Sequence, residues 1–306
     1  MSIASEITDL QTNLTSAKSA VTTKGGTVGD TGLAGLASEI ATIPSGGSLD
    51  NYGSIKYLDG SDVEHTLTLA TEEDFLALTE ASIPGSNIEV GGVTMNSAKI
   101  TEVTVADGVQ YLPSGFLQNC YGVTSVILPS TIHFIGRSAF YGCRFTSALN
   151  LENVRFIDTS FMQNNTYFNS SISLPNVEFV GDAFMRGCSS FNSSLTLNTN
   201  TVRIGQNFLY DCTSFAQSFT MPAGVKPEGG IEAVGGFFMY NCKNFVGPLV
   251  CSTPNAPSGS STLGTNDATA PMYATGVTLT GTYASTWKTA LPDRDSSPYR
   301  KLIVGS

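Results

Sequence analysis

Charge is scarce in this sequence. Only 13% of its 306 residues are charged, and 15 basic against 25 acidic residues leave a net charge of −10. A net negative chain is not drawn to phosphate backbones or anionic lipid, so we expect neither nucleic acid nor a membrane as partner. No apolar run approaches the roughly 20 residues of a membrane-spanning helix. Apolar residues still make up 41% of the chain, which is enough to fill a core.

A secretory signal is also missing from the first residues, MSIASEITDLQTNL. No basic segment begins them, and Glu6 and Asp9 interrupt any apolar run. We therefore expect the chain to be made and folded in a cytoplasm.

Residues typical of catalytic sites are few. His65 and His133 are the two histidines, and neither lies in an H-E-x-x-H metal-binding pattern. There is no G-x-S-x-G motif and no glycine-rich phosphate loop. Asp293 and Asp295 flank Arg294 in a polar stretch, a pattern more typical of solvated charge than of catalytic carboxylates. The sequence predicts no enzyme, no cofactor and no metal site, and it predicts a packing role for His133.

What the sequence has instead is a repeat. Six segments share an aliphatic residue, a phenylalanine usually four positions later, and a cysteine, once an asparagine, about four beyond that. The aliphatic anchors are Leu112, Ile135, Ile157, Val180, Ile204 and Val234, and the phenylalanines are Phe116, Phe140, Phe161, Phe184, Phe208 and Phe238. Successive aliphatic anchors lie 23, 22, 23, 24 and 30 residues apart by subtraction. A period of roughly 20–29 residues is typical of leucine-rich repeats.

Short alternating segments follow the phenylalanines, at 126–128, 149–151, 172–174, 195–197 and 219–221. Alternation with period two predicts one strand per repeat with one side buried. Stacked units of this kind share a continuous core. The predicted fold class is therefore a leucine-rich-repeat-type solenoid, rich in β-structure, with an insertion at 222–230 that loops out. Glycines after the anchors, Gly136, Gly181, Gly205 and Gly235, indicate tight turns or positive φ.

Cysteine recurs with the repeat. Cys120, Cys143, Cys188, Cys212 and Cys242 share one position, Asn165 takes that position in the third unit, and Cys251 follows the last unit. Small side chains at one repeat position are expected to form an inward row. The sequence favours buried free thiols, with disulfides or a metal cluster as the alternatives.

The segment IGRSAFYGC at 135–143, preceded by VILPSTIHF, resembles the BspA-like leucine-rich repeat family. The resemblance covers about half of the chain. It implies a curved solenoid with a strand per turn that serves as an adhesion or recognition surface.

The first 48 residues have a different pattern, with apolar residues spaced alternately by four and three, as in a coiled-coil seam. These residues are Ile3, Ile7, Leu10, Leu14, Ala17 and Val21, and a second short amphipathic segment holds Leu33, Leu36, Ile40 and Ile43. Helices this short are marginal alone, so we expect them either to pack within the chain or to form an oligomerisation and anchoring module. Residues 44–48, PSGGS, indicate a linker.

This stretch is similar to the N-terminal segment of many tail, baseplate and head-appendage proteins of bacteriophages. The resemblance implies a virion protein that contacts other virion proteins through residues 1–48 and forms a homo-oligomer, with a trimer favoured. The predicted division is an anchoring segment at 1–48, an N-terminal cap at 49–102, six repeats at 103–250, and a loop with a C-terminal cap at 251–306. The caps are expected to hold a hairpin around Asp59-Gly60, a helix at 71–79, a helix near 283–290 and a strand at 301–304.

The leading function is a tail-fibre or baseplate appendage that displays the solenoid for host attachment. The alternatives are a head decoration protein without a receptor role, and a bacterial surface adhesin, which would require a signal or sorting segment that the sequence does not display. Tyr121, Tyr141, Tyr210 and Tyr240 recur near the phenylalanine and cysteine positions. They are candidates for a strip that binds host glycan or protein, or for a wet rim of the core.

Overall fold

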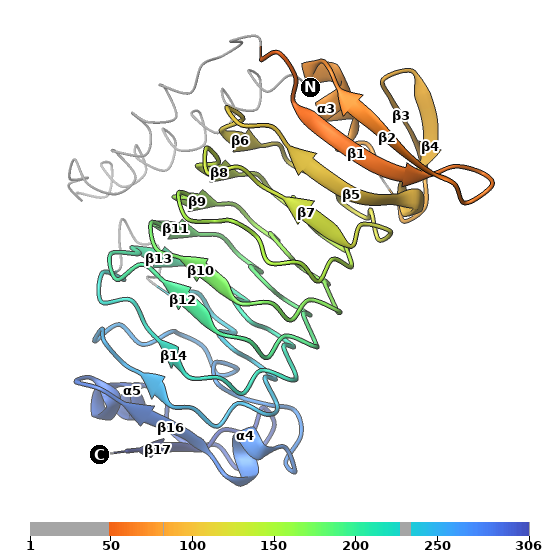
Figure 1. Ribbon diagram of the computed structural model, residues 1–306. Coiled ribbons are helices and arrows are strands. Elements are labelled where there is room, and N and C mark those ends of the chain that lie inside the picture. The colour runs from red at the N-terminus through yellow and green to blue at the C-terminus, as the bar shows by residue number, and fades with distance from the viewer. Residues whose placement is uncertain (1–48, 82, 227–233, 306) are drawn as a thin grey trace, which may run out of the picture.

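The computed structural model describes residues 49–81, 83–226 and 234–305. The predicted N-terminal helices lie outside these residues, and so do positions 227–230 of the predicted insertion. The described chain is a solenoid of stacked coils that runs from a mixed N-terminal cap to a small C-terminal unit (Figure 1).

Two ladders of short parallel strands run along the solenoid. The first is a five-stranded sheet made of β6 (Tyr111–Leu112), β8 (Phe134–Ile135), β9 (Phe156–Ile157), β11 (Phe179–Val180) and β13 (Arg203–Ile204). Val234 extends it by a bridge to Ile204. These strands contain the aliphatic anchors of the repeat. Phe134 pairs with Tyr111 on one side and with Phe156 on the other.

The second ladder contains the predicted alternating strands and lies along another side of the coils (Figure 1). Its members are β5 (Ile100–Val105) with β7 (Ser125–Ile127), β10 (Ile172–Leu174) with β12 (Leu195–Leu197), and β14 (Phe219–Thr220), β15 (Leu249–Val250), β16 (Val277–Thr280) and β17 (Leu302–Val304). Each typical coil thus holds two short strands rather than the predicted one, and the parallel ladder continues beyond the predicted end at residue 250.

One predicted strand, at 149–151, is irregular in the structure. In this part of the ladder the Val126 N–H donates to Ser147 Oγ at 3.2 Å. A side chain therefore makes a contact between coils that the main chain makes elsewhere, and the strand pairing is interrupted.

The N-terminal cap continues the second ladder. The predicted hairpin is confirmed as β1 (Gly53–Leu58) and β2 (Glu64–Leu69), and β1 also pairs antiparallel with β5. A second hairpin, β3 (Asn87–Val90) with β4 (Val93–Asn96), precedes the short 3-10 helix η1 (Ser97–Lys99).

The predicted cap helix is also confirmed, as α3 (Glu72–Ala77), and it begins at a capping box in which Thr71 and Asp74 exchange side-chain to backbone hydrogen bonds. Its Phe75 is fully buried, with its ring 5.0 Å from that of Phe116 in the first repeat. Helix α3 therefore covers the first coil.

At the other end, α4 (Pro271–Ala274) precedes β16, and α5 (Ala284–Ala290) lies between β16 and β17. The predicted helix near 283–290 and the final strand are confirmed. No helix in the described part of the chain is long and apolar enough to cross a membrane.

Two rows of phenylalanines fill the core. One row stacks Phe161, Phe184, Phe208 and Phe238 with ring centroids 5.3 to 5.6 Å apart. The other stacks Phe168, Phe191, Phe215 and Phe245 at 5.5 to 6.0 Å. All are buried, so each coil adds two rings to a continuous apolar interior.

The cysteine row runs beside these rings. All six cysteines are buried, as predicted, and the structure holds them as free thiols. The Sγ atoms of Cys143, Cys188, Cys212 and Cys242 each donate to a carbonyl oxygen of the preceding coil at 2.9 to 3.1 Å. Burial raises the pKa of Cys120, Cys188 and Cys251 from an ordinary value of 9.0 to about 12. These thiols are therefore packing groups rather than nucleophiles.

The structure gives a different reason from the predicted one for the glycines that follow the aliphatic anchors. Gly136, Gly181, Gly205 and Gly235 do not have positive φ. A Cβ on Gly205 would lie 2.4 Å from the carbonyl carbon of Gly181, and one on Gly181 would lie 2.6 Å from that of Asp158. Close approach of successive coils, and not turn geometry, requires glycine here.

Candidate binding surface on the turns beside the cysteine row

Each coil makes a tight turn immediately before its cysteine. The residue before the cysteine, or before Asn165, has a left-handed backbone in all six repeats, with φ between 57° and 76°. These residues are Asn119, Gly142, Asn164, Gly187, Asp211 and Asn241, the residue types that tolerate this conformation best.

The left-handed residues hold successive turns in register. Their N–H groups donate to carbonyl oxygens of the next coil, at Tyr141, Gln163, Arg186, Tyr210 and Tyr240 in turn, over 2.7 to 3.0 Å. These five acceptor residues each stand two positions before the cysteine or Asn165, so they stack as one column, which we call the turn column. Three of the four predicted tyrosines, Tyr141, Tyr210 and Tyr240, belong to it.

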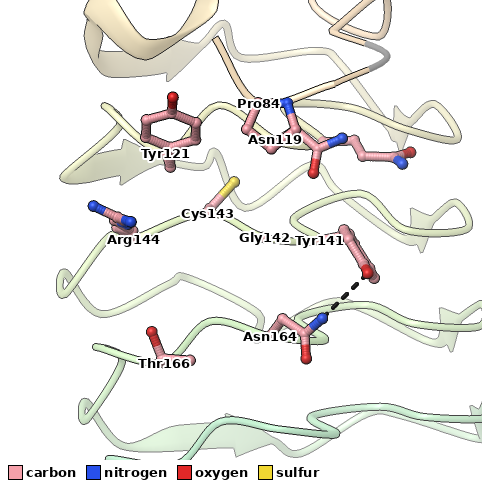
Figure 2. Close-up of a pocket in the computed structure, with 10 residues that line it drawn as sticks. Pro84, Asn119, Tyr121, Tyr141, Gly142, Cys143, Arg144, Asn164 and Thr166 are labelled. Atoms are coloured by element: carbon pink, nitrogen blue, oxygen red, sulfur yellow. Dashed lines mark hydrogen bonds between the residues drawn. The ribbon is translucent and has the colours of Figure 1, made fainter.

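Tyr121 belongs to a neighbouring column. It directly follows Cys120, and Arg144 and Thr166 occupy the same position in the next two coils. Figure 2 shows these three side chains one above another, across from Asn119, Tyr141 and Asn164. All four predicted tyrosines are half-buried, and they divide into two groups rather than forming the single strip that the sequence predicted.

Tyr121 and Tyr141 form the first group, and they line a groove with a volume of about 770 Å³ (Figure 2). Its lining residues are Pro84, Gln118, Asn119, Tyr121, Tyr141, Gly142, Cys143, Arg144, Asn164 and Thr166. The Arg144 guanidinium carbon lies 5.0 Å from the centre of the Tyr121 ring and 5.4 Å from that of Tyr167. The Asn164 amide donates to the Tyr141 hydroxyl at 3.1 Å. We call this the Arg144 groove.

Tyr210 and Tyr240 form the second group, which lies farther along the turn column. The rings of Tyr210 and Tyr240 are 5.0 Å apart, and Phe237, a residue with a relative exposure of 42%, contacts both. The Arg186 guanidinium carbon lies 4.7 Å from the Tyr210 ring centre. Burial, Tyr210 and the Asp211 carboxylate raise the pKa of the Tyr240 hydroxyl above its ordinary value.

Four aromatic or arginine residues of these groups were not predicted as site residues: Arg144, Tyr167, Arg186 and Phe237. The repeat alignment carries a signal for two of them. Arg144 follows Cys143 as Tyr121 follows Cys120, and Arg186 precedes Cys188 by two positions, as Tyr141 precedes Cys143. A search for tyrosine alone does not detect an arginine that stacks on a tyrosine.

A smaller hollow of about 330 Å³ lies beside the first ladder, lined by His133, Asn153, Arg155, Asn176, Glu178 and Asn198. Its opposite charges pair, because Arg155 Nε donates to Glu178 Oε1 at 2.9 Å. The Asn153 and Asn176 amides donate to backbone carbonyls of Ser130 and Glu152 in the preceding coils. These side chains join neighbouring coils, which is a structural role.

Rings, guanidinium groups and amides can stack and form hydrogen bonds. Within the described ranges no group of three or more His, Cys, Asp or Glu side chains could hold a metal ion.

The match to a family model agrees with the fold. A family model described as the BspA type leucine-rich repeat region (6 copies) matches residues 73–169 and 164–245. Among solved structures, the chain is similar to a leucine-rich repeat protein of T. pallidum, with 20% identity and a TM-score of 0.42, over 51% of this chain and 76% of that one. No curated protein matches the chain. Solenoids of this kind are typically binding or scaffold folds rather than catalytic ones. Since the matched segments span more than half of the sequence, the chain belongs to the BspA-type leucine-rich repeat family.

Proposed function

We propose that this protein binds a surface through the turn column and the Arg144 groove. The observation that supports the proposal most is the gathering of tyrosines with two stacked arginines on turns that the backbone holds in register. Aromatic and arginine side chains dominate the energetics of binding interfaces. A rigid backbone beneath them lowers the entropy lost when a partner binds.

We further propose that the chain is a structural protein of a bacteriophage virion, a tail-fibre or baseplate appendage that attaches to the host surface. Residues 1–48 would anchor it to other virion proteins as a homo-oligomer, with a trimer favoured. The similarity of this segment to the N-terminal segments of phage appendage proteins supports the proposal. A head decoration protein or a bacterial adhesin would use the same solenoid at another location.

Binding is tested with the labelled full-length chain on host cells. We expect Tyr141→Ala combined with Tyr210→Ala to weaken cell binding by about tenfold or more, because each aromatic side chain that a partner covers contributes about 1–2 kcal/mol. Tyr273→Ala is the matched control, since Tyr273 lies in the C-terminal unit and its hydroxyl donates to Asp295. Equal binding by the double variant and the control would contradict the proposal.

Location is tested by antibody labelling of purified particles. Label at the tail tip or baseplate is the expected result. Label on the capsid would instead assign the chain to head decoration, and label on uninfected bacterial cells would assign it to an adhesin.

A further inference from the structure

We propose that the Arg144 groove binds an acidic saccharide whose carboxylate pairs with Arg144. This inference rests on the proposed surface-binding function and names the ligand class for its main site.

Arg144 is a cation that is held in place but not neutralised. Its side chain is exposed, and among the described residues no carboxylate lies within ion-pair distance of it. The rings of Tyr121 and Tyr167 restrict its movement. Contact with ring faces leaves the in-plane N–H groups of a guanidinium able to form the bidentate pair that carboxylates accept.

Two other arginines of the repeats have acidic partners, whereas Arg137 and Arg186, like Arg144, have no ion pair among the described residues. Arg155 pairs with Glu178, and Arg203 Nη2 lies 3.3 Å from Asp182 Oδ1. On a chain with a net charge of −10, a groove lined by one arginine and no acidic residue is a local exception. The charge of the groove therefore complements a single anionic group.

The remaining lining residues favour a saccharide. Tyr121 and Tyr141 supply aromatic surface, which stacks on sugar rings, while Gln118, Asn164 and Thr166 supply amide and hydroxyl groups that can bond sugar hydroxyls. The volume of about 770 Å³ falls within the roughly 300–1,000 Å³ of typical ligand sites. A nucleic acid would need several cations along its backbone, and the groove offers one.

The test uses the full-length chain and calorimetric titration with galacturonate, glucuronate and sialyl oligosaccharides, each beside its carboxyl-reduced counterpart of equal length. We expect at least one acidic probe to bind ten times more tightly than its reduced counterpart, with a preference that weakens at high salt. Arg144→Gln is expected to bring the two within about twofold, and Arg144→Lys to give an intermediate preference because it keeps the charge without the planar fork.

Arg137→Gln is the matched control. Arg137 is exposed, belongs to the same coil and lies outside the groove lining, so this variant makes the same change of charge. It is expected to keep the preference of the wild-type chain. The inference is overturned if no acidic probe binds better than its reduced counterpart, or if the preference survives Arg144→Gln.

The cell-binding assay separates this inference from the proposed function. If the wild-type chain and Arg144→Gln bind host cells equally while the tyrosine double variant does not, the acidic-saccharide inference fails and surface binding stands. If the wild-type chain does not bind host cells, the proposed function fails whatever the calorimetry shows.

Discussion

At the scale of single residues, Asn165 shows how a repeat tolerates an exception. In the coil before it, Cys143 follows Phe140 by three residues rather than four. The Phe140 carbonyl accepts from Asn165 Nδ2 at 2.5 Å, and the Met162 carbonyl accepts from the same nitrogen at 3.1 Å. A cysteine at this position would supply one weak donor where the amide supplies two. Asparagine therefore joins its own coil, through Met162, to the preceding coil of altered spacing, through Phe140.

Replacing this amide by a carboxyl group should be costly. Asn165→Asp keeps the shape but removes both donors and turns oxygens toward two carbonyls. We expect a loss of about 2–4 kcal/mol in the free energy of unfolding, measured by urea denaturation at pH 7. Asn169→Asp is the control, since Asn169 is exposed and uses Oδ1 to accept the Asn192 N–H, a role that a carboxylate keeps. Similar losses for both variants would contradict the role assigned to Asn165.

The buried thiols make stability sensitive to alkaline pH. The folded chain keeps the Cys188 thiol protonated because its pKa is raised to about 12, whereas the unfolded chain releases that proton above the ordinary value of 9.0. Between these values folding should lose about 1.4 kcal/mol per pH unit for each such thiol. Unfolding under reducing conditions at pH 7, 9 and 10 measures the slope, and Cys188→Ala should reduce it. A free energy of unfolding that stays constant from pH 7 to pH 10 would show that the thiols are not buried.

At the scale of elements, the close stacking of the coils requires glycine after the aliphatic anchors. Gly205→Ala would place a methyl group within 2.4 Å of the neighbouring backbone, so we expect a loss of about 1–3 kcal/mol or more in thermal or urea unfolding. Gly60→Ala is the control, because a Cβ on Gly60 has no atom within 4 Å. If Gly205→Ala unfolds like the control, the coils do not approach as closely as described.

Some elements of this fold were predictable from the sequence, and others, such as the first ladder, were not. The rows of phenylalanine and cysteine were predictable because each is buried at a fixed interval, as Phe184, Phe208 and Phe238 illustrate. The first ladder was not, since a strand of two residues such as Phe156–Ile157 is too short to display alternation. The Arg144 groove needed the structure, because it combines residues of three coils whose contact depends on the register of the turns.

At the scale of the whole molecule, we propose that residues 1–48 anchor the chain and that the solenoid binds the host surface. Light scattering of the full chain should give a mass above that of the 32.2 kDa monomer, with three copies expected, and a chain that lacks residues 1–48 should be monomeric. A monomeric full-length chain would contradict the proposed oligomer. It would leave the binding surface unaffected, because that surface lies within one chain.

The central claim, that the turns beside the cysteine row contact the host, is tested most directly by hydroxyl-radical footprinting of the full chain with and without host-cell envelopes. Mass spectrometry then reads the oxidation of each tyrosine. We predict protection of Tyr121, Tyr141, Tyr167, Tyr210 and Tyr240, and unchanged oxidation of Tyr273 in the C-terminal unit. Equal oxidation of Tyr121 and Tyr141 in both samples, under conditions in which the chain is bound to envelopes, would contradict the claim.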